Sequence, residues 1–599
     1  MRSSRPSVLT QALVLMLVAA PLFADRPTLA PADLQLLRAG QEQRVLAASQ
    51  YLHAQRGRLG LDAAHAFRPG TAHTDAFGET HARFRQTYLG VPVWEGDAIT
   101  HMDAAGKHQE PTLHTFPHIF ISVDPSLRAT EALATAHADL RPQGAYTSEP
   151  TAELVVLPET LTALRAGARA KTLEAANASE IEHQVLRYTL AWHVHTELEN
   201  GTEETRHTDY LVNAHTGAVL KKWDTLHTGK PGGGGTATPA TGSGTSQWYG
   251  SVVLNTALSG GTYQLSDLTR AAGGAANSTY NLNNKTSGKG TLYTDANNAW
   301  GDGAWYSGTT ISTTSATGQT AAVDAHRGLQ ATGDFYQSGC GRNGIDNTGR
   351  AAYSRVHYSR NYDNAFWSDS CVCMTYGDGN SSGSHGEADL DTCGHEVSHG
   401  VCAAEANLTY SGESGGLNEA SSDILGTMVE FWVLGGATGS TIPAAGSITV
   451  GAKTVNANYE LVENSWNHTY PNDALRWMHK PSRDGISPDS WSSTLGKLDV
   501  HYSSGVANHF FFLLAHGSSI DSLTGPEASP LANNVASVTG IGNDKAARIW
   551  YKALTDYMTA GTNYAGARTA TLSAAADLYG TSSVEYATVQ TAWTAVTVQ

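Results

Sequence analysis

The sequence predicts an α+β protein of several domains: an α+β N-terminal part, then a β-rich half, then a helical half. Its 599 residues exceed the length at which one hydrophobic core is usual. Residues 230–245 read KPGGGGTATPATGSGT, a composition that favours an exposed linker between domains. The hydrophobic pattern changes from short β-prone runs before about residue 375 to helical spacing after about residue 386.

Residues 1–24 have the layout of a signal peptide, since two arginines precede the apolar run 12–20 and Ala24 stands before a charged pair. The large Leu22 leaves the cleavage point open. No stretch holds 18 uninterrupted apolar residues, as a membrane-spanning helix would. The formal net charge of -17 disfavours nucleic acid and anionic membranes as partners. We therefore expect a secreted, extracellular protein.

The region 25–228 shows strand-like alternation at Tyr188–Val194 and 209–212, followed by a turn at 214–217. We interpret 229–245 as a linker and processing region, because exposed segments of this kind are natural sites of proteolysis.

Beyond the linker, we expect a β-rich lobe over 246–415 and a helical lobe over 416–599. Short β-prone runs occur at 247–254 and 291–293. Helical spacing predicts four helices, at Asp391–Ala406, Asn418–Trp432, Ser504–Leu514 and Asp544–Met558.

The motif GHEVSHG places His395 and His399 four residues apart on one face of a predicted helix, a spacing that suits one zinc ion. Glu396 lies beside the metal without binding it, so it can take a proton from a zinc-bound water and deliver it to the leaving amine. The alternative for the pentapeptide alone is a chance pair of histidines on an exposed helix.

The next predicted helix, with the sequence GGLNEASSD, argues against a chance pair of histidines because it offers further residues suited to a zinc site. Glu419 can be the third protein ligand, leaving a fourth position for water and substrate. Asp423 follows at i+4 on the same face and can accept a hydrogen bond from a ligating imidazole. Its alternative is a carboxylate favoured by the helix dipole in the first turns.

The chain resembles the thermolysin family of metalloendopeptidases, and especially its pseudolysin and vibriolysin branch. The similarity extends beyond the zinc motif to a series of segments in order: NYDNAFWSDS at 361–370, MTYGDG at 374–379, LTYSGESGGLNEASSDILGTMVEFW at 408–432, ALRWMHKPSRDG at 474–485 and LDVHYSSGVANHFFFLL at 498–514. The resemblance implies a two-lobed catalytic domain with a zinc cleft between a β-rich N-terminal lobe and a helical C-terminal lobe.

The resemblance also implies roles for residues around the metal. Tyr410 and His501 would stabilise the oxyanion of the tetrahedral intermediate, which fits their capacity to donate hydrogen bonds. Asp499, two residues before His501 on a strand or extended segment, would face the same side and keep that imidazole protonated. Alone, His501 would be interpreted as an ordinary surface or core histidine.

Positions that bind substrate follow from the same resemblance. Asn364 and the backbone of Ala365 would hold the substrate main chain in an extended form. Arg476 would grip the carbonyl just beyond the scissile bond. Leu461 and Leu475 would line the pocket for the next residue, which implies a preference for bulky apolar side chains there. In isolation each of these positions has an ordinary structural interpretation.

Calcium is a second implied ion, in a number that the sequence leaves open. Five oxygen-bearing residues match the family's calcium site, and such ligands suit a hard cation: Asp391, Glu430, Asn458, Glu460 and Glu463. Asn458 stands where an aspartate is often found, which reduces the ligand charge. The alternative is a solvated acidic surface.

Five cysteines fall between residues 340 and 402. None precedes Cys340, so a thiol from the N-terminal region cannot cap the metal. By resemblance Cys340 pairs with Cys371, although Cys373 could compete. Cys393 and Cys402 flank the zinc motif, either paired or as small buried packing residues.

The N-terminal part resembles the family's propeptide at FRQTYLGVPVWEGDAITHMDAAGK (84–107) and DYLVNAHTGAVLKKWD (209–224). Resemblance implies that it assists folding, inhibits the catalytic part and is cut away near the linker by the enzyme itself, and that no extra C-terminal binding domain follows. The leading interpretation is thus a secreted zinc endopeptidase that acts on proteins and peptides. The alternatives are a noncatalytic peptide-binding homologue, and an N-terminal half that persists as an independent inhibitor or chaperone.

Overall fold

A computed structural model describes residues 31–75, 77–200, 205–225, 237–305, 313, 315–379, 386, 388–464, 474–521, 523 and 527–599. The predicted signal peptide lies outside these residues. Within them, no helix combines the length and the apolarity that crossing a membrane requires.

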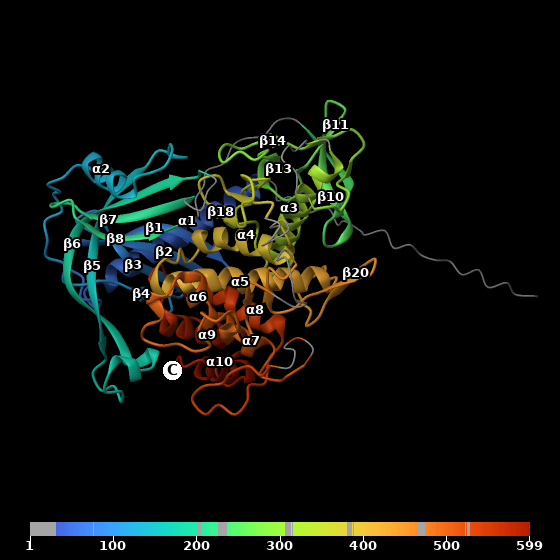
Figure 1. Ribbon diagram of the computed structural model, residues 1–599. Coiled ribbons are helices and arrows are strands. Elements are labelled where there is room, and N and C mark those ends of the chain that lie inside the picture. Colours follow the sequence, from blue (N-terminus) through green and yellow to red (C-terminus); the bar gives the residue numbers. More distant parts are fainter. Residues whose placement is uncertain are drawn as a thin grey trace, which may run out of the picture.

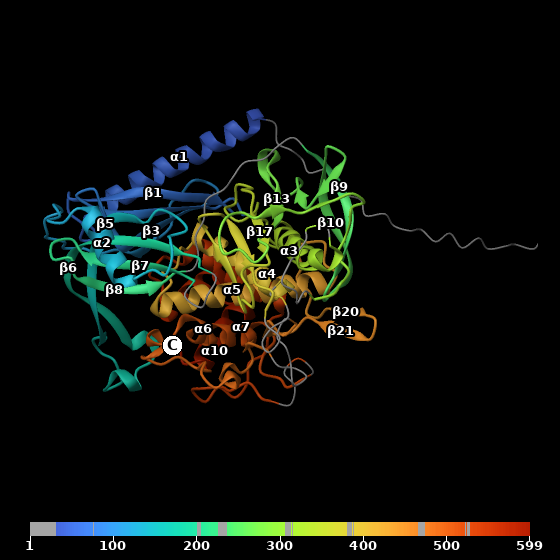
Figure 2. The ribbon, with the colours of Figure 1, turned by 45° about the horizontal axis from the view of Figure 1, so that its top comes forward.

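The N-terminal region, here residues 31–225, is built on an eight-stranded sheet in the order β1-β2-β3-β5-β6-β7-β8, with β4 paired to β3. Figure 2 shows the long helix α1 running beside β1. The elements are α1 (Pro31–Gln55), β1 (His65–Thr74), β2 (Thr80–Tyr88), β3 (Val91–Met102), β4 (Thr112–His114), α2 (Ala129–Leu140), β5 (Thr151–Leu164), β6 (Ile181–Leu198), β7 (Arg206–Asn213) and β8 (Val219–Asp224).

The strands predicted at Tyr188–Val194 and 209–212 are confirmed as parts of β6 and β7, and the predicted turn joins β7 to β8. Neither α1 nor α2 was expected from the sequence.

The β-rich half carries two sheets, in the orders β15-β11-β10-β9-β16 and β12-β13-β17-β19-β18, with β14 paired to β13. In Figure 1 they lie at the opposite end of the molecule from β5 and β6. The elements are β9 (Thr238–Ser246), β10 (Gly250–Ser259), β11 (Thr262–Gln264), β12 (Ser266–Asp267), β13 (Asn277–Asn281), β14 (Thr291–Leu292), β15 (Thr294–Asp295), β16 (Ala299–Trp300), α3 (Ala316–Asp334), β17 (Tyr353–Val356), β18 (Ala365–Ser368) and β19 (Cys373–Tyr376).

The linker prediction was wrong for residues 238–245, which belong to β9. This strand pairs along its whole length with β10, so its backbone hydrogen bonds are made inside a sheet. Its glycines serve close packing: a Cβ on Gly244 would lie 2.6 Å from Val323 of α3. The glycine, serine and threonine content was therefore not a sign of an unstructured segment. Residues 229–236 of the predicted linker lie outside the described residues.

The helical half surrounds α5, of which residues 414–432 are all buried. Its elements are α4 (Leu390–Ala404), α5 (Gly412–Leu434), β20 (Ser447–Val450), β21 (Lys453–Asn456), β22 (Glu460–Leu461), β23 (Arg476–Trp477), α6 (Val500–Ser503), α7 (Gly505–Ala515), α8 (Asn543–Lys552), a π-helical turn (Ala553–Tyr557), α9 (Tyr564–Tyr579) and α10 (Val584–Ala595). All four predicted helices are present, although α5 begins six residues earlier than predicted.

Two glycines allow α4 and α5 to pack in close contact. A Cβ on Gly394 would lie 2.8 Å from the Cα of Gly426, and a Cβ on Gly426 would lie 2.5 Å from the carbonyl oxygen of Asp391. These distances are too short for any side chain unless the helices separate. The residue types at these two positions thus set the distance between the helices that carry the zinc motif and Glu419.

A Gly426→Ala chain is expected to be destabilised by about 1–3 kcal/mol, the usual effect of overpacking a core. Its zinc affinity should fall as well, because the two helices must move apart. Chemical denaturation and zinc titration measure both effects. Gly439→Ala is the control, since a Cβ there meets nothing within 4 Å. Equal stability of the two variants would contradict this view of the helix contact.

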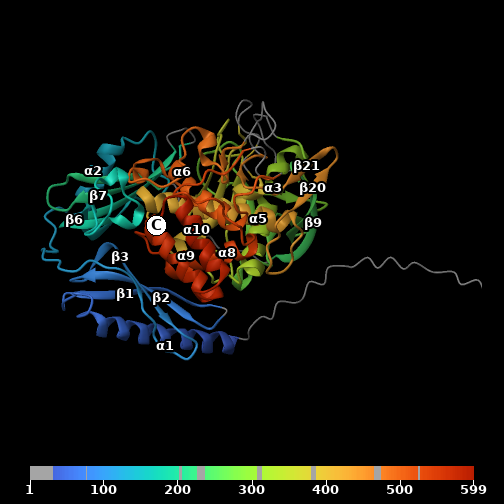
Figure 3. The same cartoon turned by 90° about the horizontal axis from the view of Figure 1, so that it is seen from below.

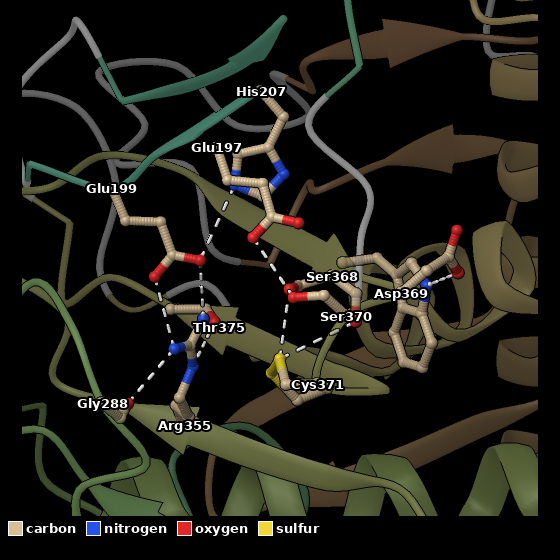
Figure 4. The surroundings of a disulfide bond; sticks show 12 residues. Glu197, Glu199, His207, Gly288, Arg355, Ser368, Asp369, Ser370, Cys371 and Thr375 are labelled. Carbon is tan, nitrogen blue, oxygen red and sulfur yellow. Dashed lines mark hydrogen bonds and ion pairs between the residues drawn. A yellow bond between two sulfur atoms is a disulfide. The ribbon is translucent and has the colours of Figure 1, made fainter. Parts of the chain in front are cut away.

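The N-terminal region packs directly against the rest of the chain, and Figure 3 shows β1 to β3 beside α8 and α9. Arg83 of β2 donates hydrogen bonds to the carbonyl oxygens of Leu554 (3.2 Å) and Thr555 in the π-helical turn after α8, and of Met558 (2.6 Å) directly beyond it. Farther along the interface, Glu199 lies 3.3 Å from Arg355 of β17, and both side chains are buried (Figure 4). One partner of this ion pair comes from the N-terminal region and the other from the β-rich half, so the pair joins the two regions.

The predicted pairing of Cys340 with Cys371 was wrong. The structure joins Cys371 to Cys373 (Figure 4), whereas Cys340 is a free thiol. The intervening Val372 has a φ of +49°, and this turn brings its two neighbours together. Cys393 and Cys402 are free and buried, which confirms their interpretation as packing residues.

Candidate functional site

Three side chains from two helices converge on one point. His395 and His399 of α4 bring their Nε2 atoms to 3.0 Å from one another, and these atoms lie 3.6 and 3.4 Å from the carboxylate oxygens of Glu419 in α5. All three residues are buried, and Glu419 Oε2 makes no hydrogen bond. Burial opposes ionisation of Glu419, but His501, His399 and His395 hold its pKa at about 2. Two imidazoles facing a buried carboxylate form a donor set that fits Zn²⁺.

The outer nitrogens of both imidazoles have partners. His399 Nδ1 donates to the carboxamide oxygen of Asn418 at 2.8 Å, while the carboxamide nitrogen donates to the carbonyl of Leu408 at 3.0 Å. This fixes the orientation of Asn418 and leaves His399 Nε2 unprotonated in the neutral ring. Asn418 was not singled out from the sequence, although its place beside Glu419 on the same helix was a usable signal. His395 Nδ1 lies 2.8 Å from Asp423 Oδ1.

Asp423 connects this group to the rest of the helical half. Its oxygens accept from Arg476 Nε (2.9 Å), Arg476 Nη2 (2.5 Å) and Asn508 Nδ2 (2.7 Å), in addition to the contact with His395. Burial raises the pKa of Asp423, but Arg476 and His395 outweigh it and lower the pKa well below its usual range. The carboxylate is therefore ionised, as a partner of a ligating imidazole should be.

Glu396 is buried next to this group on α4. Burial raises its pKa to about 7, against the influence of His395, and the backbone N–H of Trp367 in β18 hydrogen-bonds to it. A carboxyl group with a pKa near neutrality can both accept and return a proton at physiological pH.

Tyr410 and His501 also approach the carboxylate of Glu419. The Tyr410 hydroxyl donates to Glu419 and lies 3.4 Å from His501 Nε2. His501 Nδ1 lies 2.7 Å from Asp499 Oδ1. Burial lowers the pKa of His501, but Glu419 and Asp499 outweigh it and raise the pKa to about 9. The imidazolium is thus the form present at neutral pH.

The contact between Asp499 and His501 was predicted, but the element was wrong. The two residues do not lie on an extended segment: Asp499 caps the N-terminus of the short helix α6 and accepts from the backbone N–H of His501 at 3.0 Å. The cap turns both side chains to the same side, which alternation along a strand would also have done.

The positions expected to bind substrate lie in different settings. Ala365 begins β18, the edge strand of its sheet, and Asn364 accepts from Gly377 through its carbonyl at 3.0 Å. Leu461 and Arg476 pair across β22 and β23. Leu461 is 1% exposed and belongs to the core, whereas Leu475 is 38% exposed.

A second group of carboxylates lies at the start of α4. Asp391 and Glu430 are fully buried, and burial together with neighbouring carboxylates raises the pKa of Asp391, Glu430 and Glu463 well above the usual range. Asn458 Nδ2 donates to Glu463 at 3.3 Å, and Glu460 lies 3.9 Å from Arg483. Asp391 and Glu430 are buried and the other three residues are half-buried, so the group is not the solvated acidic surface considered as the alternative.

Asp389 is a further member that the sequence prediction missed. It is fully buried at the N-cap of α4, neither carboxylate oxygen makes a hydrogen bond, and it contributes to the raised pKa of Asp391. Its position two residues before Asp391 was the available signal. Buried carboxylates that repel one another are typical of a cation site.

Three family models match the chain: the thermolysin metallopeptidase catalytic domain over 241–403, the thermolysin metallopeptidase alpha-helical domain over 406–598, and the fungalysin/thermolysin propeptide motif over 66–109. The last covers most of β1 to β3.

Curated relatives agree with these matches. The chain is 39% identical to a transglutaminase-activating metalloprotease of Streptomyces mobaraensis, over 90% of this chain and 62% of that protein, so it spans less than two thirds of that relative's length. It is 32% identical to bacillolysin of Bacillus cereus, over 91% of this chain and 88% of that protein. It is also 32% identical to thermolysin of Alicyclobacillus acidocaldarius, over 87% of this chain and 84% of that protein. The converging histidines, the two catalytic-domain matches and these relatives together show that the chain belongs to the thermolysin family of metallopeptidases.

Proposed function

We propose that this chain is the precursor of a secreted, zinc-dependent endopeptidase. The convergence of His395, His399 and Glu419, with Glu396 one residue from the first ligand, carries the proposal. A noncatalytic peptide-binding homologue would be expected to lack a ligand or the base, and this chain has both.

Zinc, when bound by these three residues, supplies polarisation of the peptide carbonyl and a more acidic water molecule. Glu396 takes the proton from the attacking water and passes it to the nitrogen of the leaving amine. Tyr410 and His501 donate hydrogen bonds to the oxyanion of the tetrahedral intermediate. Asp499 keeps His501 protonated and oriented, and Asp423 orients the imidazole of His395.

The substrate is proposed to bind as an added strand along β18, with Asn364 and the backbone of Ala365 as partners. The edge position of β18 and the contact of Glu396 with Trp367 support this, because an edge strand presents unpaired backbone groups beside the base. Leu475 offers exposed apolar surface for a bulky residue after the scissile bond, and its backbone N–H donates to the carbonyl of buried Leu461 at 2.9 Å. Arg476 positions Asp423 and is proposed to bind the carbonyl beyond the scissile bond.

Calcium is proposed at the buried carboxylates at the start of α4, with Asp389 as an added ligand candidate. The N-terminal region is proposed to be a propeptide that assists folding, inhibits the enzyme and is removed by self-cleavage near residues 229–236. The buried Glu199–Arg355 pair and the contacts of Arg83 support a docked rather than an independent region. The family membership and the signal-like layout of residues 1–24 support secretion.

Hydrolysis of casein and of a blocked peptide with leucine or phenylalanine after the scissile bond tests the peptidase proposal. A chelator should abolish hydrolysis, and added Zn²⁺ should restore it, because the reaction depends on the metal that this donor set binds.

The control for substrate preference is the same peptide with aspartate after the scissile bond, which should react far more slowly. Processed, zinc-loaded protein that cleaves none of these substrates would instead favour the peptide-binding alternative.

A further inference from the structure

A cluster of histidines and carboxylates lies where the N-terminal region meets the helical half. His73 is in β1, His81 in β2 and Asp75 in the turn between them, whereas Asp556 is in the π-helical turn after α8. The zinc centre on α4 and α5 uses none of these residues. The cluster therefore has no role in the proposed peptidase chemistry.

The distances fit a shared metal ion. His73 Nε2 lies 2.9 Å from Asp556 Oδ1, and His81 Nε2 lies 3.5 Å from Asp556 Oδ2. One ligand atom from each of the three residues lies within 4.8 Å of the other two. Nitrogen and oxygen ligands around one tetrahedral zinc ion are roughly 3.3 Å apart. Asp75 Oδ2, at 3.8 Å from His81 Nε2, is close enough to serve as a fourth ligand after a small shift.

His81 provides an independent indication. Its side chain is 1% exposed, and its Nε2 makes no hydrogen bond although it points at two carboxylates. Its Nδ1 lies 2.9 Å from Nδ1 of His101, whose Nε2 lies 3.0 Å from Thr112 Oγ1.

In a neutral His101 ring that donates from Nε2 to Thr112, Nδ1 can only accept, so His81 donates from Nδ1. The free lone pair of His81 is then on Nε2, facing Asp556. This is the arrangement of a metal-ligating histidine, whose second ring nitrogen is held by a hydrogen bond.

The surrounding charges leave room for a cation. Lys552 Nζ donates to Asp556 Oδ2 at 2.7 Å and to Asp75 Oδ2 at 3.1 Å, which leaves Asp556 Oδ1 facing His73 and the hydroxyl of Thr555. Glu405 lies 3.9 Å from His73 Nδ1 and 3.8 Å from Arg83 Nε. Glu405 also pairs with Arg342 at 2.6 Å, and Asp577 lies 3.5 Å from Lys552. The three cations Lys552, Arg83 and Arg342 therefore face four carboxylates, Asp75, Asp556, Glu405 and Asp577, which leaves one negative charge unbalanced.

We propose that His73, His81 and Asp556 form a second zinc site, which joins the N-terminal region to the helical half of the precursor. Two imidazoles and a carboxylate suit Zn²⁺ better than Ca²⁺, which prefers oxygen ligands alone. Because the ligands come from both regions, the site exists only while the two are docked. Zinc bound there stabilises the docked state and is lost when the N-terminal region is removed.

Zinc content of the full-length Glu396→Gln precursor, confirmed intact by mass, tests the proposal. After dialysis against buffered Zn²⁺, about two zinc ions per chain are expected. His73→Gln keeps a hydrogen-bonding side chain but removes the imidazole, and should hold about one. His137→Gln is the matched control. His137 also lies in the N-terminal region, but it contacts Tyr146 and not the cluster, so this variant should still hold about two zinc ions per chain.

A fourth chain separates this proposal from the peptidase proposal. His399→Gln removes a ligand of the zinc centre on α4 and should keep about one zinc, at the interface. Co²⁺ added to this chain should give the visible absorption of a tetrahedral site, and the His399→Gln, His73→Gln double variant should lack it. If His73→Gln fails to fold, as circular dichroism would show, Asp556→Asn takes its place.

A count of about one zinc in the parent and none in His399→Gln would overturn the interface site and leave the cluster as a hydrogen-bonded contact. A second ion that persists in both His73→Gln and Asp556→Asn would also overturn it, because the ion would then lie elsewhere.

Discussion

A Glu396→Gln chain is expected to lose its peptidase activity by a factor of about 10²–10⁴ in kcat/KM, the usual contribution of a general base. Glutamine preserves the shape of the side chain but cannot accept the proton of the attacking water. Because Glu396 lies outside the set of His395, His399 and Glu419, the zinc content should not change. Hydrolysis of casein and of the blocked peptide measures the loss, and metal analysis measures the zinc.

The control for this variant is Glu585→Gln, which alters an ion pair between Glu585 of α10 and the half-exposed Lys545 of α8, far along the chain from the zinc motif. It should retain the parent activity. A zinc-loaded Glu396→Gln chain with full activity would exclude Glu396 as the base. The same chain expressed alone should also remain a precursor, and normal maturation would show that another protease removes the N-terminal region.

An Asp423→Asn chain is expected to lose both stability and metal. Four contacts meet at this carboxylate, and an amide cannot accept from Arg476, Asn508 and His395 together. Leaving Arg476 buried without its counter-charge should cost about 3–5 kcal/mol of unfolding free energy. Loss of the partner of His395 should weaken zinc binding by a factor of about 10–100.

Denaturant unfolding and zinc competition against a chelator of known affinity measure these two effects. Asp521→Asn is the matched control, since Asp521 also pairs with a histidine, His516 at 2.8 Å, but at an exposed site. A change there should be small, because exposed ion pairs contribute about 0–1 kcal/mol. If the Asp423→Asn chain has the same free energy of unfolding and the same zinc affinity as the parent, the network around Asp423 does not orient the ligand.

The positive charge on His501 follows from its neighbours and not from its sequence position. Asp499 lies two residues away, so the sequence could indicate that contact. Glu419 lies 82 positions earlier, and only the approach of α6 to α5 brings its carboxylate to 3.7 Å from His501 Nε2. The raised pKa of Glu396 could not be predicted from the sequence either, because a seven-residue motif does not show how deeply its side chains are buried.

Local patterns determined the features that depend on neighbours along the chain. The spacing of His395, Glu396 and His399 set one helical face, and the spacing of Glu419 and Asp423 set the next, because side chains four residues apart on a helix project together. The period of hydrophobic residues likewise indicated the change from strands to helices near residue 386.

Only the tertiary structure decided what depends on close approach between distant segments. Residues 238–245 look like a linker but form β9, because pairing with β10 and packing on α3 outweigh their weak local preference. The sequence alone left the partner of Cys371 open, did not reveal that Asp389 is buried beside Asp391, and gave no indication that His73 and His81 would meet Asp556. Contacts of this kind depend on where the elements dock, and docking is set by the packing of the whole core rather than by any one segment.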